Sequence, residues 1–413
     1  MHVMLLMTAQ TYRAESFLAA AARLGIAVTA AIDMPSRLAQ PGNGTIGVDF
    51  HDPAQAMHAI CACAEQHPLN AIISVDDSGS LLAAQASSAL GLPHNSVAAA
   101  EAARDKYRMR TLLARDGVPS PPFRRCSTDD DPHTLAAQLT YPCVLKPLRR
   151  SGSQGVMRAD DPAQFRAAMA RLARLLHTLD PTPEPQPFLV EHFIPGVEVA
   201  LEGLLDHGWL HVLALFDKPD PLDGPFFEET IYLTPSRLPD PVQAAIADCA
   251  ARAAAALGLR EGPMHAELRI NAAGPWIVEV AGRSIGGLCA KTLRFSSDVS
   301  LEELILRQAC GLPITMRDRE QRAGGVMMIP IPAAGLLKRV TGVAAAEAVP
   351  GIEEIQITAS LNYPIIPLPE GDSYLGFIFA RGETPDAVEA ALRAAHRLLE
   401  IVIAPSIPLV YSG

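Results

Sequence analysis

Two glutamates in neighbouring segments carry the clearest chemical signal in the sequence. Glu267 and Glu279 lie in short runs of alternating apolar and polar residues, and a turn that ends at Gly274 separates the runs. This pattern predicts a β-hairpin with a three-residue loop, in which Gly274 is left-handed and Asn271 faces Pro275. The register then places Glu267 directly across from Glu279, with Cβ atoms about 5 Å apart, where like charges repel each other.

A divalent cation between the two carboxylates would turn this repulsion into attraction. Hard cations such as Mg²⁺ take oxygen ligands, commonly one or two carboxylates together with nucleotide phosphates. The hypothesis is therefore a Mg²⁺–nucleotide site with Glu267 and Glu279 as the metal ligands. For either glutamate alone, a solvated carboxylate on an edge strand is the simpler interpretation. The pair, together with the cationic segment that follows it, favours the metal.

That following segment is rich in glycine and carries one arginine. Arg283 is flanked by Gly282 and Ser284, and Gly286 and Gly287 come soon after. A guanidinium group suits two-pronged binding of a carboxylate or a phosphate, so Arg283 is predicted to bind an anionic substrate. The alternative is an arginine paired with a structural glutamate.

A second cationic segment, residues 141–156, joins a short apolar strand to a loop of small residues. Lys146 lies in the strand. The loop reads Ser151, Gly152, Ser153, Gln154, Gly155. An ammonium group and a turn of backbone N–H groups can together hold a phosphate. The P-loop pattern GxxxxGK[ST] is absent from the sequence, so ATP would be held in a different way. A flexible hairpin beside a surface lysine explains this segment equally well.

The composition narrows the class of protein. The chain has 413 residues, 49% of them hydrophobic, which is enough for about two or three domains. Its net charge of −11 and the lack of a basic run disfavour nucleic acids and anionic membranes as partners. Its apolar runs fall short of the ~18 residues that span a bilayer, and its first residues do not resemble a signal peptide. The seven cysteines form no CxxC pair, so a reducing, cytoplasmic location is expected.

Strand and helix signals alternate over residues 1–103. Buried-strand runs are separated by Ala-rich helices that end at Gly25 and Gly91, and this order predicts an open parallel α/β domain. Asp76 and Asp77 end its third strand, where such sheets usually bind ligands, although helix capping is the preferred interpretation.

The chain continues with a predicted helical connector, residues 101–122, which contains Lys106. After Gly324 the pattern changes to strands, and a final helix is predicted from Thr384 to about Glu400. This last part offers no catalytic group of its own, so it is interpreted as a scaffold that closes the site.

One further stretch makes the order of parts recognisable. Residues 188–203 read as a strand, a bend at Pro195-Gly196 and an alternating strand that carries Glu198. A strand lysine with a Gly/Ser loop, then this stretch, then two paired glutamates and an arginine together resemble the ATP-grasp superfamily. Residues 279–287 look most like the branch that contains bacterial L-amino acid ligases and related carboxylate–amine ligases. The resemblance covers nearly the whole chain.

The resemblance implies an α/β fold with α+β character in its later parts. An N-terminal open parallel α/β domain would comprise residues 1–103. A central grasp domain, residues 104–312, would include a mobile lid subdomain at about 123–195. A β-rich C-terminal α+β subdomain would comprise residues 313–413.

It also implies contacts with ATP. Lys106 and Lys146 would contact the phosphates, and the lid loop over them would contain Ser151, Gly152, Ser153 and Gly155. The adenine would lie beside a hinge, largely through backbone groups. The hinge residues would be Glu191, His192, Phe193 and Ile194. Glu198 would bind the ribose hydroxyls, and Mg²⁺ (or Mn²⁺) would be held by Glu267 and Glu279.

The remaining implied roles concern the acceptor substrate. Arg283 would hold its carboxylate and later the acyl phosphate, and His265 would face the same pocket. Glu229 fits a Glu-x-x-x-x-x-Pro stretch that lies near the substrate amino group in amino acid ligases. Ala281 departs from the family pattern, because many ATP-grasp enzymes have an oxygen-bearing Asn there. A small residue at this position is typical of the amino acid ligase branch.

The function implied is that of an ATP-dependent carboxylate–amine ligase. It would form an amide through an acyl phosphate, release ADP and phosphate, and use an amino acid as a substrate. Its partners would be small-molecule carboxylates and amines, and a homodimer is compatible with the sequence. Two alternatives stay open: another ATP-grasp ligase, biotin carboxylase-like or joining a ribosylamine to an amino acid, and an ATP-binding module without turnover.

Overall fold

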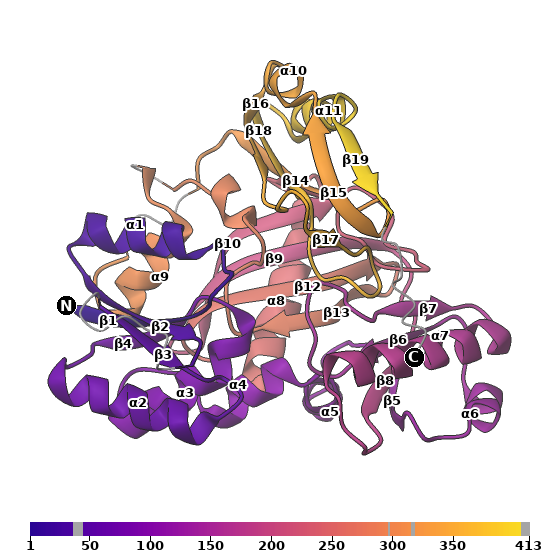
Figure 1. The fold of residues 1–413 in the computed structure, drawn as a ribbon, viewed down its shortest axis with the longest axis horizontal. Coiled ribbons are helices and arrows are strands. Elements are labelled where there is room, and N and C mark those ends of the chain that lie inside the picture. Colours follow the sequence, from indigo (N-terminus) through magenta and orange to yellow (C-terminus); the bar gives the residue numbers. More distant parts are fainter. Residues whose placement is uncertain (36–43, 296–297, 315–318, 406–413) are drawn as a thin grey trace, which may run out of the picture.

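The computed structural model describes residues 1–35, 44–295, 298–314 and 319–405 of the chain. Within these ranges the strands form four sheets. One lies in the N-terminal region, one in a lid region formed by residues 123–192, and a long sheet joins the centre of the molecule to the C-terminal region at the top of Figure 1. None of the helices in the described ranges combines the length and the hydropathy that a membrane crossing requires.

The N-terminal region is an open sheet of parallel strands in the order β3-β2-β1-β4, as predicted. Its elements are β1 His2–Thr8, α1 Ala14–Leu24, β2 Ala27–Asp33, β3 Thr45–Val48, α2 Pro53–Gln66, β4 Ala71–Ser74, the 3-10 turn η2 Asp77–Gly79, α3 Ser80–Leu90 and α4 Val97–Arg104. The helices α1 and α3 end at Gly25 and Gly91 in left-handed conformations, as the sequence predicts. β4 is an edge strand, so its outer side faces the centre of the molecule rather than another strand of this sheet.

The aspartates that end β4 do not cap a helix, so the preferred interpretation of Asp76 and Asp77 was wrong. The backbone N–H and the hydroxyl of Thr8 donate to the Asp76 carboxylate, at 2.9 and 3.0 Å. Asp77 pairs with Arg104 at 3.6 Å and with Arg283 at 3.3 Å. Asp77 therefore connects the carboxyl end of the N-terminal sheet to the glycine-rich segment.

The predicted helical connector is interrupted at Asp105. The helix α4 ends before this residue and α5, Lys106–Arg115, begins after it. The Asp105 carboxylate accepts hydrogen bonds from the N–H groups of Tyr107 and Arg108, at 3.0 and 3.1 Å, and a cap of this kind stabilises a helix by about 1 kcal/mol. The cap fixes Lys106 as the first residue of α5, where its side chain is buried.

The lid region is an antiparallel sheet in the order β5-β8-β6-β7, covered by two helices. Its elements are β5 Phe123–Ser127, α6 Pro132–Gln138, β6 Cys143–Pro147, β7 Met157–Ala159, α7 Pro162–Leu179 and β8 Pro187–His192. An apolar cluster that includes Phe165, Leu172 and Phe188 packs α7 against the sheet.

The long sheet has the strand order β13-β12-β9-β10-β11-β14-β18-β16. Its central part consists of β9 Val197–Asp206, β10 Trp209–Lys218, β11 Ile231–Thr234, β12 Gly262–Asn271 and β13 Gly274–Ala281. The strands β14 Ala323–Ile329, β16 Ile352–Ile357 and β18 Gly376–Gly382 extend it into the C-terminal region. The helices and the 3-10 turn of these parts are α8 Asp240–Leu257, η3 Cys289–Thr292, α9 Leu301–Ala309, α10 Val343–Glu347 and α11 Pro385–His396. A small sheet of β17 Pro364–Ile365, β15 Gly335–Thr341 and β19 Glu400–Ala404 completes the C-terminal region.

Contacts between the lid loop and the C-terminal region close one side of the molecule. The Gly155 N–H donates to the Pro369 carbonyl, and the Gln154 side-chain amide donates to the Glu370 carbonyl, both at 2.8 Å. Arg171 on α7 donates to both oxygens of the Glu370 carboxylate, at 2.6 and 2.8 Å. A bidentate pair of this kind fixes orientation as well as distance, so the C-terminal region holds the lid loop in place.

Candidate active site

A cavity of about 270 Å³ lies between the lid sheet and the long sheet. It brings together predicted site residues from widely separated parts of the chain. They are Lys106, Lys146, Ser151, Gly152, Ser153, Glu191, His192, Phe193, Ile194, Glu198, Glu229, His265, Glu267, Glu279 and Arg283. Gly155 does not line the cavity. A Cβ there would lie 2.7 Å from the Pro147 ring, so Gly155 permits close packing behind the lid loop.

The hairpin places its two glutamates opposite each other, as predicted, but by a different turn. Asn271 faces Gly274 rather than Pro275, so the loop has two residues instead of three. A β-bulge beside Glu267 then shifts the register by one residue and restores the pairing of Glu267 with Glu279. Both carboxylates line the cavity, which is the arrangement that a shared cation would favour.

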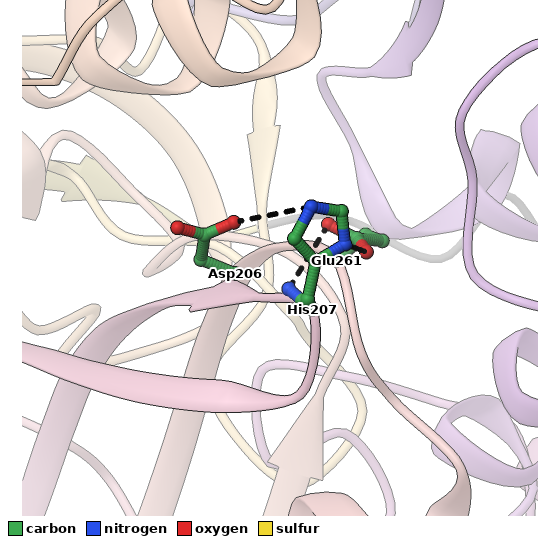
Figure 2. Close-up of side chains that lie close together, drawn as sticks. All are labelled: Asp206, His207 and Glu261. Atoms are coloured by element: carbon green, nitrogen blue, oxygen red, sulfur yellow. Dashed lines mark hydrogen bonds and ion pairs between the residues drawn. The ribbon is translucent and has the colours of Figure 1, made fainter.

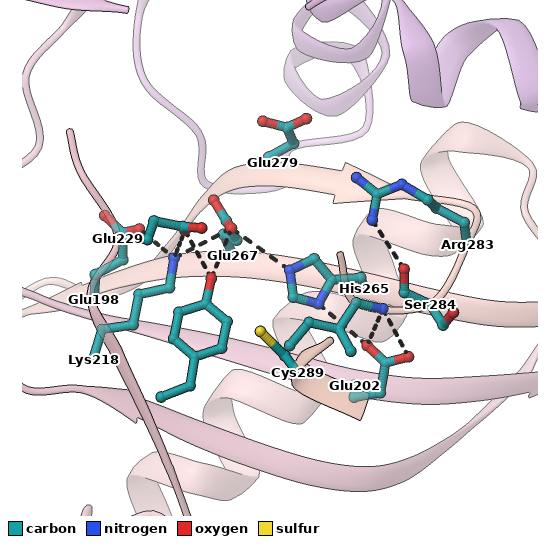
Figure 3. A network of polar contacts seen from close by, with 12 residues as sticks. Glu198, Glu202, Lys218, Glu229, His265, Glu267, Glu279, Arg283, Ser284 and Cys289 are labelled. Atoms are coloured by element: carbon teal, nitrogen blue, oxygen red, sulfur yellow. Dashed lines mark hydrogen bonds and ion pairs between the residues drawn. The ribbon is translucent and has the colours of Figure 1, made fainter. Parts of the chain in front are cut away.

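The centre of the site is a lysine that the sequence did not single out. Lys218, the last residue of β10, is buried among three carboxylates (Figure 3). Its ammonium lies 2.8 Å from Glu198, 2.5 Å from Glu229 and 3.2 Å from Glu267. Buried charges require partners of this kind. Lys218 does not itself line the cavity, and its ammonium holds together three glutamates that do.

The carboxylates around Lys218 differ in their proton affinity. Burial and the charge of Glu267 raise the pKa of Glu229 to about 7, although Lys218 opposes the shift. Burial would also raise the pKa of Glu267, but the charge of Lys218 and the hydrogen bond from His265 hold it well below its usual range. The Tyr232 hydroxyl donates to Glu229 at 2.7 Å. Glu229 can therefore gain or lose a proton near neutral pH while Glu267 stays ionised.

Glu191 has a different environment from the one expected of a hinge residue. Its side chain is buried and lies between two cations, 2.7 Å from Arg110 and 2.8 Å from Lys146. Burial alone would raise the pKa of Glu191, but the two positive charges outweigh it and lower the pKa. The carboxylate therefore holds Lys146 in position from the neighbouring strand of the lid sheet.

Both oxygens of the Glu198 carboxylate contact cations. One lies 2.8 Å from Lys218, and the other accepts a hydrogen bond from Arg269 at 2.9 Å. Arg269 also lies over the ring of Phe193 in the predicted hinge, 4.8 Å from its centroid. A ribose hydroxyl would have to share Glu198 with these groups, and its predicted role stays a prediction.

His265 lies between Glu267, a candidate metal ligand, and the buried carboxylate of Glu202. Its ring nitrogens lie 3.2 Å from Glu202 and 3.5 Å from Glu267. Burial would lower the pKa of His265, but hydrogen bonds and charge from the two glutamates raise it to about 9. Glu202 in turn accepts hydrogen bonds from the Ile285 N–H in the glycine-rich segment. A protonated His265 thus fixes both the hairpin and the segment that carries Arg283.

Arg283 lines the same cavity and contacts both the glycine-rich segment and the N-terminal region. Its Nη1 donates to the Ser284 carbonyl at 2.9 Å, and its Nε lies 3.3 Å from Asp77 (Figure 3 shows the first contact). The partner of Arg283 is therefore an aspartate of the N-terminal region, rather than the structural glutamate considered as the alternative. Arg13 supports the same segment, because it donates to the Ser284 hydroxyl at 2.5 Å.

Lys106 connects the lid loop to the second glutamate of the hairpin. Its ammonium donates to the Arg150 carbonyl at 2.8 Å and lies 3.3 Å from Glu279. The side chain of Glu279 keeps 30% of its surface exposed, so one side of it stays available to a ligand.

The donor set fits a hard divalent cation. Glu267 and Glu279 offer carboxylate oxygens at the cavity wall, and Lys106 and Lys146, which line the same cavity, can balance the charge of phosphates. Glu198, Glu229 and Glu267 could also converge on an ion, with oxygens within 4.8 Å of one another. Lys218 already supplies the positive charge there, so the hairpin pair is the better candidate.

Three further residues escaped the sequence analysis, for a common reason. Lys218, Arg110 and Arg269 lie in runs that match no recognisable motif. The one available signal was the cost of burying a charge in a run that reads as strand or helix. Apart from Glu229, which lies near Lys218 in the sequence, their acidic partners are far away along the chain, so that signal named no partner.

Comparison with known proteins identifies the class. Residues 139–292 match the ATP-grasp domain, residues 18–94 match the ATP-grasp N-terminal domain, and residues 327–404 match the L-amino acid ligase C-terminal domain 2. The chain belongs to the ATP-grasp superfamily, and it has the ATP-grasp fold that the resemblance implied.

Individual relatives are carbon–nitrogen ligases. The solved L-amino acid ligase from Bacillus licheniformis is 26% identical, with a TM-score of 0.78 over 97% of this chain and 98% of that one. Alanine–anticapsin ligase of Bacillus subtilis is 28% identical over 246 residues, 55% of this chain and 51% of the relative. Dapdiamide A synthase of Enterobacter agglomerans is 28% identical over 239 residues, 55% of each chain. The chain thus spans about half the length of these curated relatives.

Proposed function

We propose that this protein is an ATP-dependent carboxylate–amine ligase that uses an amino acid as one substrate. The observation that carries the proposal is one cavity that three kinds of group line together. They are two lysines, Lys106 and Lys146, the facing pair Glu267 and Glu279, and Arg283. Phosphates, a divalent cation and a carboxylate are the ligands that these groups suit. The ligases among its relatives support the same activity.

The first step activates the acid. An oxygen of the substrate carboxylate, oriented by Arg283, forms a bond to the γ-phosphorus of ATP, and the bond between that phosphorus and the β–γ bridging oxygen breaks. The products are an acyl phosphate and ADP. Lysines at the phosphates stabilise the charge that spreads over the transferred group. A bound Mg²⁺, held by Glu267 and Glu279, would supply further stabilisation of the same charge.

The second step forms the amide. The amine nitrogen forms a bond to the acyl carbon, and the bond from that carbon to the phosphate oxygen breaks, so inorganic phosphate leaves with the electron pair. The amine must lose a proton, and Glu229 is the proposed acceptor because its pKa is raised to about 7. His265, protonated between Glu202 and Glu267, orients the hairpin and does not compete for that proton.

Glu279→Gln tests the metal-binding role directly. We expect this variant to lose ADP formation by about 10²–10³-fold, because one anionic ligand of the cation is gone, while its fold stays intact. ADP release would be measured over a panel of amino acids paired with amines, with circular dichroism as the check on folding. Glu347→Gln, on α10 away from the cavity, is the matched control.

Two outcomes would contradict the proposal. The metal role fails if Glu279→Gln forms ADP at the parent rate with the best substrate pair. The ligase function fails if the parent protein binds ATP but forms no ADP with any acid and amine.

A further inference from the structure

A second cavity lies behind Arg283, outside the site described above. It has a volume of about 150 Å³ and lies along the outer edge of β4, between the helices α3 and α4 on one side and the start of β12 on the other. Arg283 lines both this cavity and the first. At the opposite end, His94, Glu261 and Gln308 line both the second cavity and a third one of about 790 Å³. The three cavities therefore follow one another toward Arg283.

The second cavity contains polar groups that the folded chain does not use. Ser87 is 1% exposed, and its hydroxyl oxygen has no hydrogen-bond partner among the described residues. The buried side-chain oxygen of Gln308 also lacks a partner there, although its amide nitrogen donates to the Leu205 carbonyl. An unsatisfied buried polar atom costs about 1–3 kcal/mol. Both side chains line the cavity, so a polar ligand inside it would recover that energy.

The wall between these polar groups is made of small apolar side chains. Ala83 and Ala84 on α3, with Ala100 and Ala103 on α4, are buried residues that line it. A wall of alanines leaves room for a short aliphatic group. The ligand that fits is therefore a small molecule with an apolar body and a polar head.

The third cavity, at the end farthest from Arg283, has an acidic lining that would attract a cationic ligand. Asp206, His207 and Glu261 lie together near the turn between β9 and β10 (Figure 2), and Glu261 lies 2.9 Å from His207. Arg260 donates to the His207 carbonyl beside them at 2.9 Å. The carboxylates of Asp206 and Glu261 outnumber the one guanidinium beside them, and an acidic group of this kind would attract an ammonium group.

At the end of the second cavity next to Arg283, two ion pairs separate it from the first cavity. Asp77 lies 3.6 Å from Arg104 and 3.3 Å from Arg283. The side chains of Asp77 and Arg104 keep 28% and 23% of their surface exposed, so these pairs are not sealed in the core. An incoming ammonium group could replace a guanidinium on Asp77 and leave Arg283 to the substrate carboxylate on its other side.

We propose that the second cavity admits and holds the amine substrate, a small aliphatic amine of the amino acid class, before it attacks the acyl phosphate. This inference rests on the ligase function proposed above. The lid loop is held by the C-terminal region over the first cavity, so a separate route lets the amine arrive while the acyl phosphate stays shielded from water. The amine nitrogen moves past Asp77, bonds to the acyl carbon, and phosphate leaves as in the second step.

Ala100→Phe tests the route by filling it, and Ala98→Phe on the exposed face of the same helix is the matched control. We expect Ala100→Phe to lower kcat/KM for the amine at least 10-fold and to leave KM for ATP and for the acid unchanged. Hydroxylamine, small enough to pass, should still trap the acyl phosphate as a hydroxamate within 2-fold of the parent rate. Ala98→Phe should match the parent in every assay.

Other results would contradict either the proposed route of the amine or the proposed ligase function. The route is wrong if Ala100→Phe keeps the parent kcat/KM for the amine, or if hydroxamate formation falls as far as amide formation does. The milder Ala100→Leu replaces Ala100→Phe if the latter does not fold, and it should discriminate against larger amines more than against smaller ones. A parent protein that makes no hydroxamate with any acid refutes the ligase function itself, and the route with it.

Discussion

Replacing Lys218 with methionine will reduce ADP formation by about 10²-fold, which is the loss that a small displacement of the groups around a reacting centre can cause. Its ammonium lies within 3.2 Å of Glu198, Glu229 and Glu267. Without it, three closely spaced carboxylates repel one another, and the glutamates that line the cavity lose the group that fixes their positions. ADP release at saturating ATP, with the best substrate pair, measures the effect.

The control for this variant is Lys291→Met. Lys291 is exposed, its ammonium lies 3.0 Å from Glu354, and it is not part of the cavity lining. It should keep parent activity, which separates the loss of a particular charge from the loss of any lysine. The role of Lys218 is refuted if the methionine variant folds and turns over ATP at more than a tenth of the parent rate.

Replacing Glu191 with glutamine will lower the free energy of unfolding by about 3–5 kcal/mol, because one partner of a buried ion pair is removed while the other remains. Arg110 is fully buried, and its guanidinium would keep only weaker partners such as the Val278 carbonyl. Lys146 would lose the same carboxylate, so KM for ATP should rise as well. Urea unfolding and initial-rate kinetics measure the two effects.

The pH dependence gives a second readout for this variant. The folded-state pKa of Glu191 lies below its usual 4.5, so the ionised carboxylate contributes its full stabilisation above that pH and loses it as the pH falls through the lower value. The stability difference between parent and variant should therefore narrow below pH 4.5. A difference of constant size down to pH 3 would contradict the assignment. Arg115→Met, at an exposed pair with Asp116, should leave stability unchanged at every pH.

The parts of the site that depend on local patterns were predictable. The period-two runs around Glu267 and Glu279, with a glycine between them, predicted the hairpin and the facing pair, and the structure confirms both. The turn itself was predicted wrongly by one residue, because a bulge has no signature in the side-chain pattern on either strand. The pairing was recovered only because the bulge offsets the shorter loop.

The parts that depend on long-range contacts were not predictable. Lys218 contacts Glu229 within its own neighbourhood, but Glu198 and Glu267 reach it from other strands of the sheet. Asp77 was taken for a helix cap because capping is a local interaction, whereas its partner Arg283 is in another region. A local sequence pattern indicates which interactions a side chain can make, but it does not identify a partner that is distant in the sequence.

The continuity of the long sheet bears on how the protein can be divided. The strand β11 pairs with β14 on its far side, and β14 begins after the segment where the grasp domain was predicted to end. A protein truncated there would leave backbone N–H and C=O groups of β11 unpaired. An exposed edge strand of this kind can pair with other chains and cause aggregation. Expression of the ATP-binding half by itself is therefore a poor strategy, and tags or fusions are better attached where they leave both halves of the sheet together.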